Sequence, residues 1–475
     1  MTVDLKRSAK GDSTIIETDY LVVGAGASGM AFTDSLIAHS DADVVLIDRR
    51  HRAGGHWNDD YPFVRLHQPS AYYGVDSRAL GTDRIDQNGA NAGFYERATG
   101  AEICDYYARV LEQNLVPSGR VRFRGMHEYV GETAGEHQIT SLLTGETTAI
   151  RVRRKLVDAT YIATTIPSMH KPTFSADPGA RVIAPNELVD LADPGSGFTV
   201  MGAGKTSMDT CCWLIEQGVT PQSIRWIRPR DPYTVDRSWM QPLGLMGSLI
   251  EWLALQTEAA SEATDATDLV HRLEASRVLQ RLDPDVEPSV YRGATLSEQE
   301  LATLRSIDNV VRLGRLLHVG LDTIELDRGT INTDPKHVHI DCTAPGLGTP
   351  PTRPIFEQGR ITIQRVQAGI DPFSAALIGR VEATGRGDED MNRLCPANDM
   401  RGEATAFAPA MLVTLLARTA WMGDPELREW FTATRLNPLH DAARYMNDAS
   451  RASAQRLIQS NLPAIENLQR MLARG

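Results

Sequence analysis

The fold is decided by residues 18–50, TDYLVVGAGASGMAFTDSLIAHSDADVVLIDRR. The apolar run YLVV predicts a strand, and the glycines that follow it have the spacing G-x-G-x-x-G. A second apolar run, VVLI, ends in Asp48, where an acid is expected to bind the 2′-hydroxyl of a ribose. Strand, glycine turn, helix, strand and acid, in this order, predict a Rossmann unit that binds a dinucleotide.

Each glycine of this motif has its own physical role. Gly24 permits the tight turn, Gly26 lets the backbone approach a pyrophosphate, and Gly29 lets helix and strand pack closely. The helix that follows directs unpaired N–H groups and the positive end of its dipole at the anion. We therefore predict that a dinucleotide is bound by Gly24, Gly26, Ala27, Ser28, Gly29, Asp48 and Arg49.

Residues 198–209, FTVMGAGKTSMD, fit two different motifs. The triplet GKT resembles the end of a P-loop, which would make the protein a nucleoside triphosphatase. A P-loop needs a glycine five positions before the glycine of that triplet, and Thr199 stands there instead. The Rossmann interpretation needs only a serine in place of the third glycine. We therefore predict a second dinucleotide site at Gly202, Gly204, Lys205, Thr206 and Ser207.

The residues after the second strand of each unit indicate which coenzyme it binds. Asp48 suits a ribose with a free 2′-hydroxyl. In the second unit the stretch IRWIRPRDP places Arg228 and Arg230 after the strand, where cations would meet a 2′-phosphate. Arginines also flank strands on ordinary surfaces. Two of them at this position favour NADPH over NADH.

Composition limits the possible partners. The chain has 475 residues, which suits two or three domains, and a formal net charge of −12 at pH 7. Nucleic acid or an anionic membrane would be repelled by this charge. No apolar run approaches the 18 residues of a membrane span, and no apolar signal segment stands at the start. We predict a cytoplasmic protein that binds neither nucleic acid nor a membrane.

The cysteines exclude one class of two-nucleotide enzyme. They are Cys104, Cys211, Cys212, Cys342 and Cys395. None forms a CxxC or CxxxxC pair, so the dithiol of a disulfide reductase is missing. No cluster of histidine, cysteine and aspartate has the spacing of metal ligands, and we predict no metal site.

Residues 49–70, RRHRAGGHWNDDYPFVRLHQPS, resemble the class B flavin-dependent monooxygenases, which include flavin-containing, N-hydroxylating and Baeyer–Villiger enzymes. In that family a GG-x-W segment and then a YPxxR stretch follow the first Rossmann acid. The matching residues here are Gly54, Gly55, Trp57, Tyr61, Pro62 and Arg65. The resemblance spans both nucleotide units and implies FAD at the first and NADPH at the second. It is weak through 240–305 and the C-terminal helices.

The resemblance also implies further site residues. It adds FAD contacts at Gly55, His56, Trp57, Arg65 and His67. Arg65 and His67 are the candidates for catalysis, because the family places this stretch near the flavin. His67 would act as an acid or base, since imidazole titrates near neutral pH, or as a hydrogen-bonded structural histidine. Both interpretations stay open.

The sequence departs from the family pattern at two places. Baeyer–Villiger enzymes have an acid two residues after the arginine, and His67 stands there. Their linker reads FxGxxxHxxxW, whereas residues 164–174 read TTIPSMHKPTF, with only His170 and Phe174 in register. For His170 we favour a structural role in the linker. These departures favour a divergent branch that acts on nitrogen or sulfur.

The two glycine motifs start 202 − 24 = 178 residues apart, which suits one nucleotide domain inserted into another. We predict an α/β fold with two Rossmann-like domains. The FAD-binding domain is expected at 14–170 and 336–400, and the NADPH-binding domain at 195–335. A helical insertion is expected at 240–305 and a helical C-terminal segment at 401–475.

The resemblance implies that NADPH reduces FAD and that oxygen then forms a C4a-(hydro)peroxyflavin. That species would oxygenate a nitrogen, sulfur or carbonyl centre of a small molecule, and molecular oxygen would be the second substrate. The alternative is an NADPH-dependent flavin oxidoreductase that reduces or dehydrogenates its substrate without oxygenation. A nucleotide-binding regulator without activity is a third hypothesis. The chain is compatible with a homo-oligomer.

Overall fold

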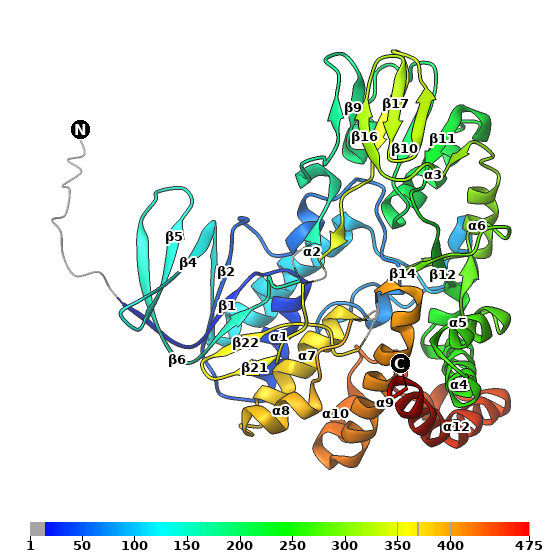
Figure 1. Ribbon diagram of the computed structural model, residues 1–475. Helices are drawn as coiled ribbons and strands as arrows, with labels where there is room; N and C mark the ends of the chain where they lie inside the picture. Colours follow the sequence, from blue (N-terminus) through cyan, green and yellow to red (C-terminus); the bar gives the residue numbers. More distant parts are fainter. Residues whose placement is uncertain (1–14, 163, 349, 368–369, 400, 475) are drawn as a thin grey trace, which may run out of the picture.

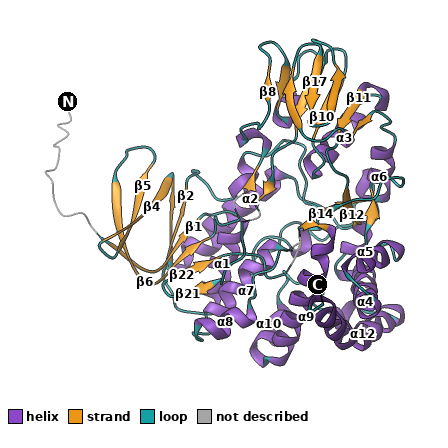
Figure 2. Ribbon diagram, in the orientation of Figure 1, coloured by secondary structure: helices purple, strands orange, loops and turns teal. Residues whose placement is uncertain are grey.

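The computed structural model describes residues 15–162, 164–348, 350–367, 370–399 and 401–474 (Figure 1). Two parallel sheets form separate lobes, and helices gather on one side of the molecule, below the second lobe (Figure 2). Residues 14 and 400, at which we expected domain boundaries, lie outside the described residues.

The first lobe is built on a Rossmann sheet. Its strand order is β21 (Phe356–Glu357), β22 (Arg360–Thr362), β6 (Thr147–Asp158), β1 (Ile16–Val23), β2 (Val44–Asp48) and β3 (Val121–Gly125). All neighbours are parallel except the β21–β22 pair. An antiparallel ribbon of β4 (His127–Thr133) and β5 (Glu136–Ser141) extends from β6. This confirms the first predicted unit.

Helix α1 (Ala27–Ala38) connects β1 to β2 and is buried over most of its length. Helix α7 (Asp371–Glu382) crosses it at Gly379, where an added Cβ would lie 2.6 Å from the Phe32 carbonyl oxygen. Helix α2 (Gly100–Val110) follows in the β2–β3 connection and begins with a capping box at Thr99 and Glu102. The glycine loop thus leads into a rigidly packed helix.

The second lobe contains the second Rossmann sheet. Its all-parallel order is β15 (Val310–Val311), β11 (Ile224–Ile227), β10 (Phe198–Met201), β19 (Val338–Asp341) and β9 (Arg181–Ile183). Helix α3 (Lys205–Glu216) follows β10. A smaller sheet has the order β18 (Gly329–Asn332), β17 (Thr323–Leu326), β16 (Leu316–Val319) and β8 (Ser175–Ala176). The second predicted unit is therefore also present.

One expected boundary, at residue 336, needs correction. Strand β19 lies within 336–400, which we assigned to the first domain, yet it pairs with β10 and β9 of the second sheet. The chain returns to the first sheet only at β21 and β22. Short strands β7 (Thr164–Thr165) and β20 (Gly346–Leu347) pair in the two connections between the lobes.

The insertion at 240–305 is only partly helical, contrary to expectation. Helices α4 (Met246–Glu262) and α5 (Ala266–Ala275) are followed by strands before α6 (Glu298–Arg305). Of these strands, β13 (Gln280–Arg281) and β14 (Val290–Leu296) join β12 (Pro232–Asp236), which precedes the insertion, and β23 (Gly402–Glu403) in a sheet of order β13-β12-β14-β23. Strand β23 belongs to the C-terminal segment, so that segment completes the sheet.

The C-terminal segment is mainly helical, with α8 (Asp388–Leu394) preceding α9 (Phe407–Gly423), α10 (Pro425–Ala433), α11 (Ala442–Tyr445) and α12 (Asp448–Leu472). Helix α12 lies along α4. Arg456 on α12 forms ion pairs with Glu251 at 2.8 Å and Glu258 at 2.5 Å on α4. Among the described residues, one stretch, Ala404–Gly423, is long and apolar enough to cross a membrane by length and composition, and here it packs against α10 and α12.

Candidate functional site

The first glycine loop has the backbone geometry that a dinucleotide requires. Gly24 adopts a φ of +101°, and an added Cβ at Gly29 would lie 1.8 Å from the Gly24 carbonyl oxygen. Helix α1 begins after Gly26 without a side-chain cap, so its first N–H groups are free to bind an anion. Asp48 accepts hydrogen bonds from the backbone N–H groups of Ala25 at 2.7 Å and Arg50 at 2.8 Å. Arg49 beside it is exposed.

The GG-x-W segment lies directly against this loop. It forms the short helix η1 (Gly55–Asn58), in which an added Cβ at Gly55 would lie 2.9 Å from the Gly26 Cα. The Trp57 indole N–H donates to the Tyr73 hydroxyl at 2.8 Å, and the His56 ring lies 4.9 Å from the indole. The structure therefore brings the two motifs of the first domain together.

A buried carboxyl that the sequence analysis missed follows this segment. The Asp60 side chain is 8% exposed and lies 4.0 Å from His56 Nε2. Burial raises the pKa of Asp60 to about 7, and the nearby Asp209 and Asp59 carboxylates act in the same direction. Burial and the Arg50 guanidinium lower the pKa of His56 to about 4. The pair is therefore able to hold or release one proton near neutral pH. In the sequence, the only sign of this buried carboxyl was the pair of adjacent acids in the stretch NDDYP.

We expect Asp60→Asn to stabilise the fold increasingly as pH rises. The folded pKa lies above the unfolded value of about 3.9, so wild-type stability falls as pH rises through about 7. Asparagine stays neutral and escapes this loss. The advantage of the variant should grow by about 2 kcal/mol between pH 5 and pH 8 in urea unfolding.

Asp59→Asn is the matched control, because Asp59 is more exposed and its carboxylate pairs with Arg50 at 2.6 Å. We expect a loss of up to about 1 kcal/mol that does not grow with pH. A pH-independent difference between Asp60→Asn and wild type would show that this carboxyl does not titrate near neutrality.

The YP segment docks on the second domain. The Tyr61 hydroxyl donates to Asp209 at 2.8 Å, and the Phe63 ring stacks on Trp213 at 4.7 Å. Asp209 also pairs with Lys205, the first residue of α3. Lys205 is thereby held against its own helix. Its ammonium group can contact a phosphate, as expected, only if this ion pair opens.

His67 does not have the acidity expected of a neutral-pH acid or base. Burial and the nearby Lys205 ammonium lower the pKa of His67 to about 3, so the imidazole is neutral at pH 7. Its carbonyl oxygen accepts a hydrogen bond from Thr295 at 2.8 Å. This backbone contact fixes the position of the residue, and the hydrogen-bonding role of the imidazole stays a prediction. Arg65 is exposed and donates to the Arg97 carbonyl oxygen at 3.2 Å.

A buried ionic cluster, formed by Arg97, Arg237 and Glu300, ties the lobes together beside His67. Glu300 on α6 lies 3.4 Å from Arg97 and 2.5 Å from Arg237, which belongs to the short helix η9 (Arg237–Met240). Burial would raise the pKa of Glu300, but Lys205, Arg237 and Arg97 lower it to about 2. The carboxylate is therefore charged at all physiological pH values.

The second glycine loop is open at its centre. Gly202 has a φ of +134°, and an added Cβ there would lie 2.5 Å from the Cys342 carbonyl oxygen. An added Cβ at Gly204 would meet nothing within 4 Å, and α3 begins there without a side-chain cap. Ser207, in the place of the third glycine, donates to the Gly204 carbonyl oxygen at 2.7 Å. Thr206 lies beside it in the first turn.

The expected role of Arg228 needs correction. This side chain is 4% exposed, pairs with Asp231 at 3.2 Å and Asp283 at 3.7 Å, and lies over the Trp226 ring. Its charge is thus already neutralised inside the lobe, where no 2′-phosphate would reach it. The pattern of arginines after the strand could not show that two aspartates form ion pairs with Arg228.

Arg230 remains accessible and has a cationic neighbour that the sequence analysis missed. Its side chain is 46% exposed and pairs with Glu403 at 2.9 Å. Partial burial and the positive charges of Arg230 and Arg401 lower the pKa of Arg292 on β14. Arg292 gave no signal, because the sequence pattern assigned its strand to a helical insertion.

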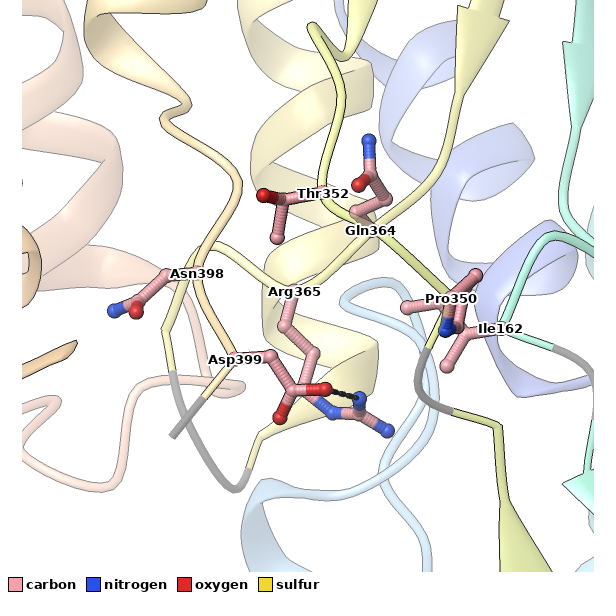
Figure 3. A pocket seen from close by; sticks show the side chains of 7 residues that line it. All are labelled: Ile162, Pro350, Thr352, Gln364, Arg365, Asn398 and Asp399. Carbon is pink, nitrogen blue, oxygen red and sulfur yellow. Dashed lines mark hydrogen bonds and ion pairs between the residues drawn. The ribbon is translucent and has the colours of Figure 1, made fainter. Parts of the chain in front are cut away.

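A small pocket lies where the connections between the lobes meet the approach to α7. Figure 3 shows its lining residues, Ile162, Pro350, Thr352, Gln364, Arg365, Asn398 and Asp399. Arg365 pairs with Asp371, the first residue of α7, at 2.6 Å and with Asp399 at 3.4 Å. The pocket wall is therefore fixed by ion pairs at the start of a buried helix.

The linker histidine lies outside this arrangement. His170 follows a short turn of helix over Pro167–Met169 and shows no side-chain hydrogen bond among the described residues. Phe174 is buried in the core beneath β16 and β17. The segment 164–174 therefore serves as a connection between the lobes, and the structural role of His170 stays a prediction.

A family model agrees with the first Rossmann unit. Residues 22–75 match the family model of the NAD(P)-binding Rossmann-like domain. Over 436 residues the chain is 44% identical to the uncharacterized protein Rv2000 of Mycobacterium tuberculosis, covering 92% of this chain and 80% of that protein. The chain belongs to the Rv2000 family. Because Rv2000 is described as uncharacterized, membership of the Rv2000 family assigns no activity.

Solved structures similar to this member of the Rv2000 family include flavoenzymes. A flavin-containing monooxygenase from Stenotrophomonas maltophilia has 12% identity and a TM-score of 0.42 over 73% of this chain and 85% of that one. A cyclohexanone monooxygenase from Rhodococcus sp. Phi1, bound to NADP+, has 12% identity and a TM-score of 0.45 over 88% of both chains. TM-scores this low leave the function to be inferred from the chain's own residues.

Proposed function

We propose that this protein is an FAD- and NADPH-dependent monooxygenase that acts on a nitrogen, sulfur or carbonyl centre of a small organic molecule. One observation supports this most directly. The segment from Gly55 to Tyr61 connects two glycine loops, touching Gly26 of the first and Asp209 beside the second. Each loop follows the carboxyl end of a parallel strand, which is where such sheets bind dinucleotides.

The residues of the first loop fit FAD. The close approaches at Gly29 and Gly55 leave the uncapped N–H groups of α1 for a pyrophosphate, with Asp48 for the ribose. When bound there, FAD would accept a hydride from the coenzyme, and the reduced flavin would be the group that reacts with molecular oxygen. We assign Gly24, Gly26, Ala27, Ser28, Gly29, Asp48, Arg49, Gly55, His56 and Trp57 to this site.

The residues of the second loop fit the pyrophosphate of NADPH, and the Arg230–Arg292 pair supplies cations for its 2′-phosphate. Around the junction, neutral His67 can donate or accept a hydrogen bond, and Asp60 with His56 can hold a proton near pH 7. Tyr61, Phe63 and Trp213 pack over the junction and exclude water from it.

We expect Arg230→Ala and Arg292→Ala each to raise the KM for NADPH about tenfold or more while leaving the KM for NADH unchanged, since only NADPH carries the 2′-phosphate. Initial rates with both coenzymes measure this. Arg315→Ala, an exposed arginine at the edge of the same lobe, is the control and should change neither value. Equal losses for both coenzymes would refute the 2′-phosphate assignment.

The transfer of an oxygen atom to the substrate is tested with oxygen labelled with ¹⁸O. The purified protein with FAD and NADPH is given ¹⁸O2 and a panel of amines, sulfides and ketones, while NADPH consumption and peroxide release are followed. NADPH supplies the electrons, one oxygen atom enters the product and the other leaves as water. We expect mass spectrometry to find the heavy isotope in the product of one substrate class.

The same experiment identifies the alternative enzyme. NADPH-dependent conversion of a substrate without isotope in the product would instead make the protein a reductase or dehydrogenase. A protein that takes up no FAD and consumes no NADPH would contradict both enzymes and favour a regulator. The cytoplasmic location expected from the sequence remains part of this proposal.

A further inference from the structure

A second cluster of polar side chains lies in the second lobe, apart from the cofactor loops. Thr199 on β10 is paired in register with Arg225 on β11 at one side and with His339 on β19 at the other. Side chains paired in this way point to the same face of a sheet. His337 precedes His339 by two residues, and their rings lie 5.8 Å apart. We call these four side chains the Thr199 cluster.

The Thr199 cluster carries hydrogen-bonding atoms that the fold leaves unused. Within this cluster, four buried atoms have no hydrogen-bond partner among the described residues: Thr199 Oγ1, Arg225 Nη1, His337 Nε2 and His339 Nδ1. Thr199 is 0% exposed and His339 is 1% exposed. Burying such an atom unpaired costs free energy, so several of them close together are unusual. Four on one face indicate a missing binding partner.

The charges around the cluster indicate an anion as this partner. Arg225 forms no ion pair among the described residues, and the acid that acts on His337 is the exposed Asp334. Burial, then His337 and Arg225, lower the pKa of His339 to about 4. A water molecule would satisfy the hydrogen bonds but would leave the half-buried guanidinium without a counter-charge.

We propose that the Thr199 cluster binds an oxyanion, a phosphate or sulfate group, through one hydroxyl, two imidazoles and one guanidinium. The site lies on the amino-terminal half of the second sheet, whereas the glycine loop follows the carboxyl end of β10. It is therefore separate from the cofactor site, and half-buried Arg225 and His337 form its solvent side. Both imidazoles gain a proton more easily once the anion is bound, so binding strengthens as pH falls.

Sulfate is the probe, because it stays doubly charged between pH 6 and 8 and any pH dependence then belongs to the protein. Calorimetric titration of the full chain should give a Kd at least tenfold lower at pH 6 than at pH 8. Arg225→Met should raise the Kd at pH 6 at least tenfold. His318→Gln, a histidine of the same lobe whose ring already has Ser175 and Asp177 as partners, should leave it unchanged.

Thr199→Val gives an independent test, because this variant should lose the response to sulfate without losing stability. Without sulfate the variant should melt at the wild-type temperature or above it, because an unpaired hydroxyl is replaced by a methyl group of the same shape. Sulfate should raise the melting temperature of the wild type but not of this variant. Flavin content and NADPH consumption should not change in any of these variants.

The source of the anion is distinguished by comparing inorganic phosphate with glycerol phosphate. Binding of both indicates a phosphorylated metabolite, and binding of phosphate alone indicates the free ion. No saturable sulfate or phosphate binding, or equal binding by wild type and Arg225→Met, would overturn the proposal.

Discussion

Gly29→Ala is expected to purify with less than about a tenth of the wild-type flavin. The added methyl carbon would lie 1.8 Å from the Gly24 carbonyl oxygen, far inside the contact distance. Helix α1 cannot retreat, because Gly379 of α7 already lies against its backbone. The loop must therefore move and take with it the N–H groups assigned to the pyrophosphate. Such overpacking also costs about 1–3 kcal/mol of stability.

The ratio of flavin to protein absorbance measures the first effect and denaturant unfolding the second. Gly423→Ala is the control, because an added Cβ at this end of α9 meets nothing within 4 Å. We expect full flavin content and a stability change below about 1 kcal/mol. A Gly29→Ala protein with full flavin content would show that this turn does not hold the pyrophosphate, and the first cofactor site would be wrongly placed.

Glu300→Ala is expected to lower the free energy of unfolding by about 3–5 kcal/mol, because two buried arginines would lose the carboxylate between them. Arg237 is 0% exposed and Arg97 is 8% exposed, so water cannot replace the ion pair. The carboxylate also accepts the Ser297 backbone N–H at 2.8 Å and so caps α6. Urea unfolding at pH 7 measures the loss.

The pH dependence of this cluster has a definite sign. The pKa of Glu300 is lower in the folded protein, about 2, than in the unfolded chain, about 4.3. Its stabilisation is therefore complete above about pH 4.3 and is lost as pH falls towards 2. Glu298→Ala, an exposed acid in the first turn of the same helix, should cost less than about 1 kcal/mol. Equal losses in the two variants would show that the buried pairs do not stabilise the protein.

The sequence was sufficient for both Rossmann units, because their glycines and apolar strands are local features. Gly24, Gly29 and Gly202 have the conformations and close approaches that the motif requires. Between residues 275 and 298 the sequence pattern predicted a helix, but the structure has strands β13 and β14 there. These strands are held by partner strands that are distant in sequence. Strand β23 pairs with β14 from the C-terminal segment, and no local pattern indicates such a partner.

Side-chain roles were predictable only where one motif decided them. Arg228 follows its strand as expected, but Asp283 reaches it from another part of the chain. Asp60 and Glu300 acquire their shifted acidity from burial and from neighbours on other elements. The same holds for the Thr199 cluster, whose members come together only when three strands align.

The pairing of α12 with α4 has a consequence for biosynthesis. Arg456 and Glu258 are 198 residues apart, so at about 5–20 residues per second the ribosome needs roughly 10–40 s to deliver the second helix after the first. Throughout this interval the nascent α4 exposes the surface that α12 will cover. The pairing of α4 with α12 therefore forms only after α12 has left the ribosome, and a folding helper that shields α4 during translation would raise the yield of active protein.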